Sequence, residues 1–131
     1  MNMGFDLMEY ILVVEDNANL LKLVSVNLTS RGYDVSEAIN GQEALSRLRL
    51  DPPSLIILDL KLPDITGWEL LQTMKQDPLI KTDFPVLIMT ASITDALVDL
   101  ESYPSVREVL IKPFSSGKLL SAVERALNQR G

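Results

Sequence analysis

The sequence predicts an α/β fold: a doubly wound, five-stranded parallel sheet with helices on both faces. Three observations support this prediction. Apolar runs of strand length alternate with helical patterns five times along the chain. Two of these runs are apolar at almost every position, as in strands that are covered on both faces. The 131 residues show no repeat or second domain, and their 47% hydrophobic content suits a single core.

Residues 10–38 are predicted to form the first strand, the first helix and the second strand. YILVV (residues 10–14) is an apolar run of strand length. After EDN, a helix that ends at Gly32 is predicted by three apolar residues at helical spacing, Leu21, Val24 and Leu28. YDVSEA (residues 33–38) alternates polar and apolar side chains, as a strand with one exposed face does.

The next elements are a helix, a central strand and a third helix. NGQEALSRLRL places apolar side chains on one helical face and is closed by Pro52 and Pro53. LIILD (residues 55–59) has the pattern of a strand buried on both faces. The third helix, ending near Asp77, is predicted by the helical spacing of Trp68, Leu71 and Met74.

The last part of the chain supplies two strands and two helices. PVLIMTA (residues 85–91) is a second central strand. A weaker, acidic helical pattern covers about residues 94–102 and stops before Pro104. EVLI (residues 108–111) is the fifth strand. A final helix follows KPF, with apolar positions at Leu119, Leu120, Val123 and Leu127.

The composition excludes several classes of site. The chain has no histidine and no cysteine, so it lacks the imidazole and thiolate groups used in many catalytic and metal sites. Oxygen atoms would have to hold any metal, which favours a hard cation such as Mg²⁺. The net charge of −6 and the lack of a basic stripe argue against direct nucleic-acid binding.

The N-terminal residues are not expected to be a signal peptide. MNMGFDLMEY lacks a positive segment, so we expect residues 1–9 to be a short tail before a domain of residues 10–131. No apolar run approaches the roughly 20 residues that span a membrane. The absence of cysteine makes the cytoplasm the expected compartment.

Polar residues follow the ends of four predicted strands. They are Glu15, Asp16, Asp59, Thr90 and Lys112. Ligands of open parallel sheets bind at the carboxyl ends of the strands, so we expect these side chains to share one pocket. A carboxylate that ends an apolar strand is costly to bury unless a partner uses its charge.

These residue types suit phosphoryl transfer to a carboxylate. Three clustered carboxylates repel one another, and a divalent cation relieves that repulsion. Asp59 could act as a covalent nucleophile that becomes an aspartyl phosphate. The ammonium group of Lys112 and the hydroxyl group of Thr90 could each contact phosphoryl oxygens.

Four motifs, VVED, LIILDLKLPDITG, VLIMTA and IKPF, occur in an order and spacing that resembles the receiver domain of two-component response regulators, of the chemotaxis-receiver type. The resemblance covers about residues 10–129. It implies a flavodoxin-like (βα)5 fold with strand order 2-1-3-4-5. It also implies a switch in phosphorelay signal transduction, with Mg²⁺-dependent self-phosphorylation and slow self-dephosphorylation, and not a metabolic enzyme.

The resemblance implies a role for each site residue. Asp59 would accept a phosphoryl group from a phosphohistidine of a sensor histidine kinase or a histidine phosphotransfer protein. Lys112 would pair with that group, Thr90 would turn toward it, and Pro113 would follow a cis peptide bond. Pro63 and Gly67 would shape the loop after the acceptor. The implied Mg²⁺ ligands are Glu15 (through water), Asp16, Asp59 and the backbone carbonyl of Lys61.

Two stretches depart from the family's pattern. Val109 stands where the family usually carries an aromatic residue that moves with the threonine. Residues 105–108, SVRE, replace a common Gly-Ala-Asp-Asp, so we expect a rearranged fourth helix and fifth strand. Val109 keeps open an alternative function, a receiver-like scaffold that binds partners without being phosphorylated.

Two enzyme or cofactor classes fit less well. A haloacid dehalogenase-like phosphatase needs a second acid two positions after the nucleophile, where this chain has Lys61. A flavodoxin-like flavin binder needs a phosphate loop after the first strand, where Glu15 and Asp16 would repel an anion.

Output would pass to a protein effector, or to a fused output domain if the chain is part of a longer regulator. Both a monomer and a weak homodimer are compatible with the sequence.

Overall fold

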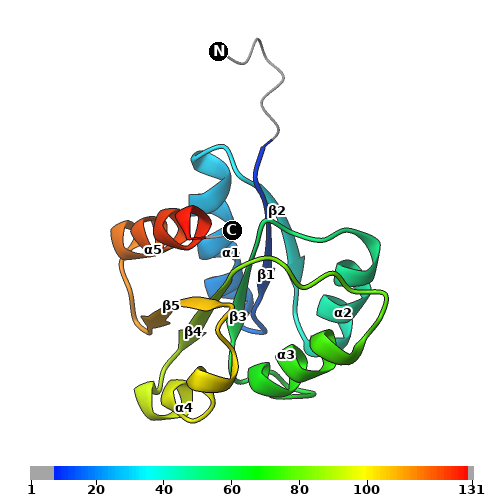
Figure 1. The fold of residues 1–131 in the computed structure, drawn as a ribbon. Helices are drawn as coiled ribbons and strands as arrows, with labels where there is room; N and C mark the ends of the chain where they lie inside the picture. The colour runs from blue at the N-terminus through cyan, green and yellow to red at the C-terminus, as the bar shows by residue number, and fades with distance from the viewer. Residues whose placement is uncertain (1–7, 130–131) are drawn as a thin grey trace.

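Five parallel strands form the centre of the computed structural model, which describes residues 8–129 (Figure 1). The strands are β1 (Tyr10–Val14), β2 (Asp34–Ala38), β3 (Leu55–Asp59), β4 (Val86–Thr90) and β5 (Val106–Ile111). Their order in the sheet is β2-β1-β3-β4-β5, and each neighbouring pair is parallel. The predicted fold class and strand order are confirmed.

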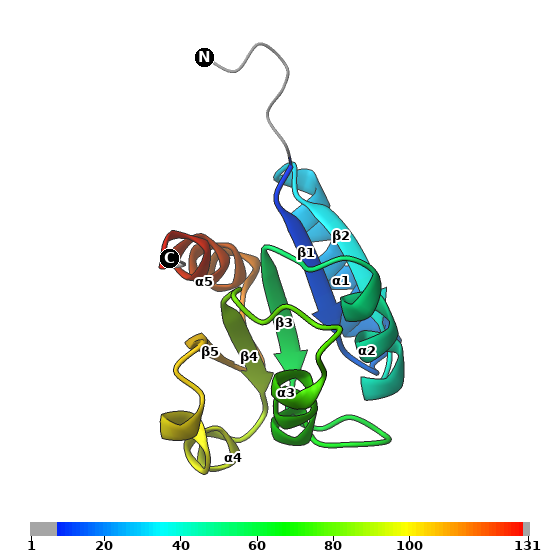
Figure 2. The same ribbon diagram turned by 45° about the vertical axis from the view of Figure 1, so that its right-hand side comes forward.

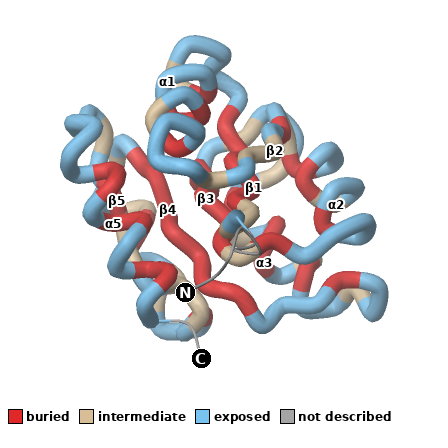
Figure 3. The backbone as a smooth tube through the Cα atoms, turned by 90° about the horizontal axis from the view of Figure 1, so that it is seen from above, coloured by how far each residue is buried: buried red, intermediate tan, exposed pale blue. Residues whose placement is uncertain are grey.

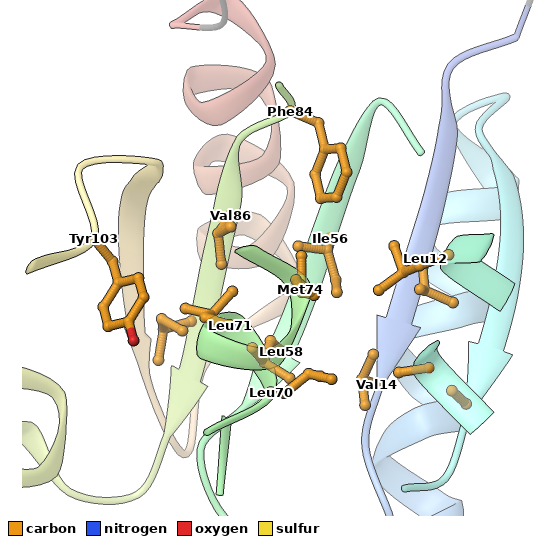
Figure 4. Close-up of a cluster of buried hydrophobic side chains, with 14 of the residues drawn as sticks. Leu12, Val14, Ile56, Leu58, Leu70, Leu71, Met74, Phe84, Val86 and Tyr103 are labelled. Carbon is orange, nitrogen blue, oxygen red and sulfur yellow. The ribbon is translucent and has the colours of Figure 1, made fainter. Parts of the chain in front are cut away.

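Helices cover both faces of the sheet. The helices are α1 (Ala18–Ser30), α2 (Gly41–Leu50), α3 (Gly67–Gln76), α4 (Ile93–Leu97) and α5 (Ser116–Asn128). Leu12 and Val14 of β1 pack with buried side chains of α2 and α3, in the cluster of which Figure 4 shows a part. Ile11 and Val13 face the other way and pack with α1 and α5. This alternation follows from the two-residue period of a strand.

The central strands carry the core. Every residue of β3 and β4 is buried, which agrees with the prediction that both are covered on two faces (Figure 3). Burial on both faces explains why these runs read as continuously apolar. Asp59 at the end of β3 and Thr90 at the end of β4 are therefore attached to a well-packed part of the fold.

Local sequence signals account for the helix ends. A side chain caps the N-terminus of each helix by accepting a backbone N–H, and the capping residues are Asn17, Asn40, Thr66, Ser92 and Ser115. Thr66 and Glu69 form a reciprocal capping box at the start of α3. Gly32 has a φ of 88°, so it ends the α1 region in the left-handed conformation that glycine favours.

The fourth helix is shorter than its predicted range, residues 94–102. The structure has α4 at Ile93–Leu97 and then a separate 3₁₀ turn, η1, at Leu100–Ser102. Ala96 is the one buried residue of α4, so this helix buries little apolar surface against the core. So little apolar packing cannot hold a longer helix together. β5 begins at Val106, two residues before its predicted start, and its pairing with β4 has a register shift after Val86.

Most of the expected N-terminal tail lies outside the described residues, which begin at Met8. The division at residue 10 therefore stays a prediction. Within residues 8–129, no helix is long and apolar enough to cross a membrane.

Candidate functional site

The carboxyl ends of four strands place the polar residues at one edge of the sheet, where the arrows of Figure 2 end. Asp59 is the last residue of β3, and Thr90 is the last residue of β4. Glu15 and Asp16 come directly after β1, and Lys112 comes directly after β5. Because β1 and β3 are neighbours in the sheet, their acidic ends lie side by side.

Lys112 joins the ends of three strands. Its Nζ donates to Glu15 Oε1 and to Asp59 Oδ2, and both distances are 2.9 Å. The side chains of Glu15 and Asp59 are 1% and 7% exposed, while that of Lys112 is 22% exposed. Charge-assisted hydrogen bonds between groups so far out of water are stronger than those on the surface.

The second oxygen of each buried carboxylate contacts the backbone. Asp59 Oδ1 accepts from the amide of Lys61 at 3.0 Å, and Glu15 Oε2 accepts from the amide of Asn17 at 3.0 Å. Both carboxylates are therefore held in one orientation by a hydrogen bond at each oxygen.

Burial and pairing act in opposite directions on the protonation of this cluster. Burial raises the pKa of Glu15, and the hydrogen bonds from Lys112 and Asn17 offset this only in part. For Lys112, burial lowers the pKa, but the hydrogen bonds to Asp59 and Glu15 outweigh that effect and leave the pKa raised. Lys112 is therefore held as a cation against the two buried carboxylates.

The three acids converge in a way that suits a hard cation. One carboxylate oxygen from each of Glu15, Asp16 and Asp59 lies within 4.8 Å of the others. Glu15 and Asp59 are buried, whereas Asp16 is exposed and open to solvent. A single lysine leaves this cluster with excess negative charge, and an all-oxygen donor set of this kind fits Mg²⁺. The predicted contribution of the Lys61 carbonyl stays a prediction.

The loop after Asp59 is held close to the end of β3. A Cβ atom on Gly67 would lie 2.8 Å from the Asp59 carbonyl oxygen and 2.9 Å from Leu60 Cα, so the backbone approaches too closely for any side chain. The Gly67 amide donates to the Leu60 carbonyl at 2.8 Å. Lys61 and Thr66 form a bridge across the base of the loop.

Asp64 is a structural residue of this loop that the sequence analysis did not identify. Its carboxylate accepts from the amides of Gly41 at 2.8 Å and Gln42 at 2.9 Å, at the start of α2. These backbone hydrogen bonds lower the pKa of Asp64. The partners lie more than twenty positions away in the chain, so no local pattern could have indicated the contact.

The hydroxyl group of Thr90 makes its hydrogen bonds with Ser92 in this structure. Its Oγ1 accepts from the Ser92 amide at 3.1 Å and donates to the Ser92 carbonyl at 3.2 Å. The side chain is buried, at the end of a strand whose neighbour ends on Asp59. The structure thus places Thr90 at the same edge of the sheet but pairs its hydroxyl with the start of α4.

Two further sequence expectations can be located. The Lys112–Pro113 peptide bond is cis, as the resemblance implies. Val109 is partly buried against the core cluster on the α3 side of the sheet. That cluster also contains Tyr103, which lies after η1.

Comparisons with known proteins agree with this geometry. The family model described as "Response regulator receiver domain" matches residues 11–124. The chain is 36% identical over 125 residues to the DNA-binding dual master transcriptional regulator RpaA of Synechocystis, covering 94% of this chain and 50% of that protein. It is 35% identical over 121 residues to the alkaline phosphatase synthesis transcriptional regulatory protein PhoP of Bacillus subtilis, covering 91% of this chain and 48% of that protein.

A solved structure shows the same likeness in three dimensions. The response regulator protein TrrA of Thermotoga maritima, in complex with Mg²⁺-BeF, superposes with a TM-score of 0.78 and 31% identity, covering 91% of this chain and 99% of that one. The chain spans about half the length of the curated relatives that it matches. From the family model and these relatives, the chain belongs to the response regulator receiver domain family, the switch domain of two-component phosphorelay signalling.

Proposed function

We propose that this domain accepts a phosphoryl group on Asp59 and changes a partner-binding surface in response. The observation that carries the proposal is the pair of 2.9 Å hydrogen bonds from Lys112 Nζ, which join Asp59 to Glu15 at the end of the sheet. This arrangement presents a buried carboxylate beside a fixed cation. A phosphoryl group that arrives there meets both a nucleophile and a positive charge.

The residues of the chain would share the reaction as follows. A carboxylate oxygen of Asp59 attacks the phosphorus atom, a P–O bond forms, and the P–N bond to the donor imidazole breaks. Lys112 neutralises part of the charge on the new acyl phosphate. Slow attack of water on that acyl phosphate would return the domain to its starting state.

Glu15, Asp16, Asp59 and the Lys61 carbonyl would hold Mg²⁺ at this site. When bound, the ion would supply positive charge for the phosphoryl oxygens. The oxygen atoms of the three acids are close enough to share one ion, which supports this proposal. The exposed position of Asp16 leaves a route by which the ion could enter.

The donor would be a sensor histidine kinase or a histidine phosphotransfer protein, as in the receiver domain family. The absence of histidine from the chain is compatible with this, because the donor imidazole would belong to the partner. RpaA and PhoP are named as transcriptional regulators, and they are about twice as long as the part that this chain matches. Output through a separate effector protein and output through a further domain of a longer protein are both consistent with that. Direct nucleic-acid contact by the residues of this chain is not part of the proposal.

The intact mass of the protein after incubation with acetyl phosphate tests this function. We expect one phosphoryl adduct in the presence of Mg²⁺ and none in the presence of a chelator. The adduct should be absent from Asp59→Asn and present in the control Asp83→Asn, which changes an exposed aspartate far from the site. If the native chain forms no adduct with a donor that phosphorylates another receiver domain, the proposal is wrong and a phosphorylation-independent scaffold is favoured.

A further inference from the structure

Hydrogen bonds from other elements hold the helix α4 at its N-cap, Ser92, and at Asp95, the middle of its five residues. It is five residues long, and Ala96 is its buried residue. A helix of this length is not stable alone in water, and the last four carbonyl groups of any helix lack a partner within it. Contacts made by other parts of the chain therefore decide whether α4 stays formed and where it lies.

Thr90 holds the N-terminal end. Its hydroxyl group makes hydrogen bonds with both the amide and the carbonyl of Ser92. Ser92 is the N-cap of α4, and its side chain accepts from the Asp95 amide at 3.2 Å. The residue that begins the helix is thus bound by the same hydroxyl that, by the resemblance to receiver domains, would turn toward a phosphoryl group.

Trp68 of α3 holds the middle of the helix. Its indole Nε1 donates to the Asp95 carbonyl at 3.0 Å. Asp95 is one of the last four residues of α4, so the indole supplies a partner that the helix itself cannot. This contact gives Trp68 a role beyond the helix packing that its position in the sequence suggests.

The indole ring is itself held against the segment that follows α4. Trp68 stacks on Tyr103, with ring centroids 5.4 Å apart and planes at 22°. The Tyr103 hydroxyl donates to Gln72 Oε1 at 2.9 Å, and Lys75 Nζ lies 5.2 Å from the centre of the Tyr103 ring. One face of α3 therefore contacts both α4 and the residue that follows η1.

We propose that Trp68 is a positioning residue that links Thr90 to the α4–η1 segment, residues 91–103. When the Thr90 hydroxyl leaves Ser92, α4 loosens at its N-terminus, and the hydrogen bond between Trp68 and Asp95 breaks. The segment then changes its position against α3, with Tyr103 as its remaining anchor. Val109 has no ring that could make this link, whereas Trp68 contacts the segment directly, at Asp95 and at Tyr103. The part of this proposal in which phosphorylation moves the Thr90 hydroxyl away from Ser92 rests on the proposed function.

The link can be tested first without phosphorylation. Thr90→Val removes the hydroxyl and keeps the shape of the side chain, and Thr82→Val is a control at an exposed threonine. Trp68 is the single tryptophan of the chain, so its fluorescence reports on this site alone. We expect Thr90→Val to change the Trp68 emission and to raise amide hydrogen exchange in residues 91–103 by about 3- to 10-fold, the factor for one average hydrogen bond. The control should change neither.

Trp68→Phe tests the indole N–H itself. Phenylalanine can still stack on Tyr103 but cannot donate to Asp95, and Tyr103→Phe is the matched control because it loses only the bond to Gln72. We expect Trp68→Phe to raise amide hydrogen exchange in residues 91–103 before phosphorylation. The further rise in exchange on phosphorylation should then be smaller than in the native chain. Tyr103→Phe should keep the response of the native chain.

Intact mass measured on every sample separates the two proposals. A phosphoryl adduct with no effect of Thr90→Val on Trp68 emission or exchange would overturn the link and leave the proposed function standing. No adduct, together with the expected effect of Thr90→Val, would overturn the proposed function and leave the link between Thr90 and Trp68 standing. Exchange in unphosphorylated Trp68→Phe equal to that of the native chain would also overturn the link.

Discussion

Replacing Lys112 by methionine should destabilise the fold, because it removes the cation that pairs with two buried carboxylates. The ammonium group makes two charge-assisted hydrogen bonds of 2.9 Å. Bonds to charged groups contribute about 1.5–3 kcal/mol each, and leaving a buried charge unpaired costs about 3–5 kcal/mol. Since the Lys112 side chain is 22% exposed, water relieves part of this cost, and we expect a loss of about 3 kcal/mol.

Urea unfolding in Mg²⁺-free buffer at neutral pH measures this loss. Lys118→Met is the matched control: it changes the net charge equally, but its side chain is exposed at the start of α5. We expect the control to change the free energy of unfolding by less than about 0.5 kcal/mol. Added Mg²⁺ should restore more stability to Lys112→Met than to the native chain, because the cation replaces the missing charge among three carboxylates. Equal stability of Lys112→Met and Lys118→Met would refute the reasoning.

Three further predictions concern the loop, the pH dependence and the metal. Gly67→Ala should lower the free energy of unfolding, measured by urea titration, by about 1–3 kcal/mol, because its Cβ would meet the Asp59 carbonyl. The control Gly117→Ala should be neutral or slightly stabilising, because no atom lies closer than 3.9 Å to the added Cβ. Asp64→Asn should cost about 1 kcal/mol or less at pH 7. The pKa of Asp64 is lowered in the folded protein, so its carboxylate stabilises the fold above the unfolded pKa near 3.9. This stabilisation is lost as the pH falls through the lower folded pKa, so the native chain and Asp64→Asn should converge in free energy of unfolding on acidification. A difference in stability that persists unchanged at low pH would count against the capping role. Asp16→Asn should reduce the rise in melting temperature that Mg²⁺ gives the native chain, and an unchanged rise would remove Asp16 from the set of ligands.

The parts of the fold that the sequence predicted well are those governed by periodicity. Strands β3 and β4 are buried on both faces, so their continuous apolar runs could be recognised without knowing their neighbours. The site residues could be predicted because each lies at the end of a strand or just after it, and parallel strands end at one edge. The order of the strands came from the resemblance, because periodicity does not specify which strands pair.

The parts that the sequence did not predict depend on contacts between distant residues. The division of the fourth helix into α4 and η1 depends on how little of it packs against the core, which its acidic, weakly amphipathic pattern only suggested. The hydrogen bonds from the α2 amides to Asp64 and from Trp68 to Asp95 join residues more than twenty positions apart. Such contacts become visible only when the helices are placed on the sheet.

The central claim is that Asp59 is the residue that accepts the phosphoryl group. Its most direct test is to treat the phosphorylated protein with borohydride, which reduces an aspartyl phosphate to homoserine, and to locate the change by peptide mass mapping. We predict homoserine at position 59 alone, and only in samples that contained both Mg²⁺ and a phosphodonor. Homoserine at position 16 or at any other aspartate, with position 59 unchanged, would contradict the claim.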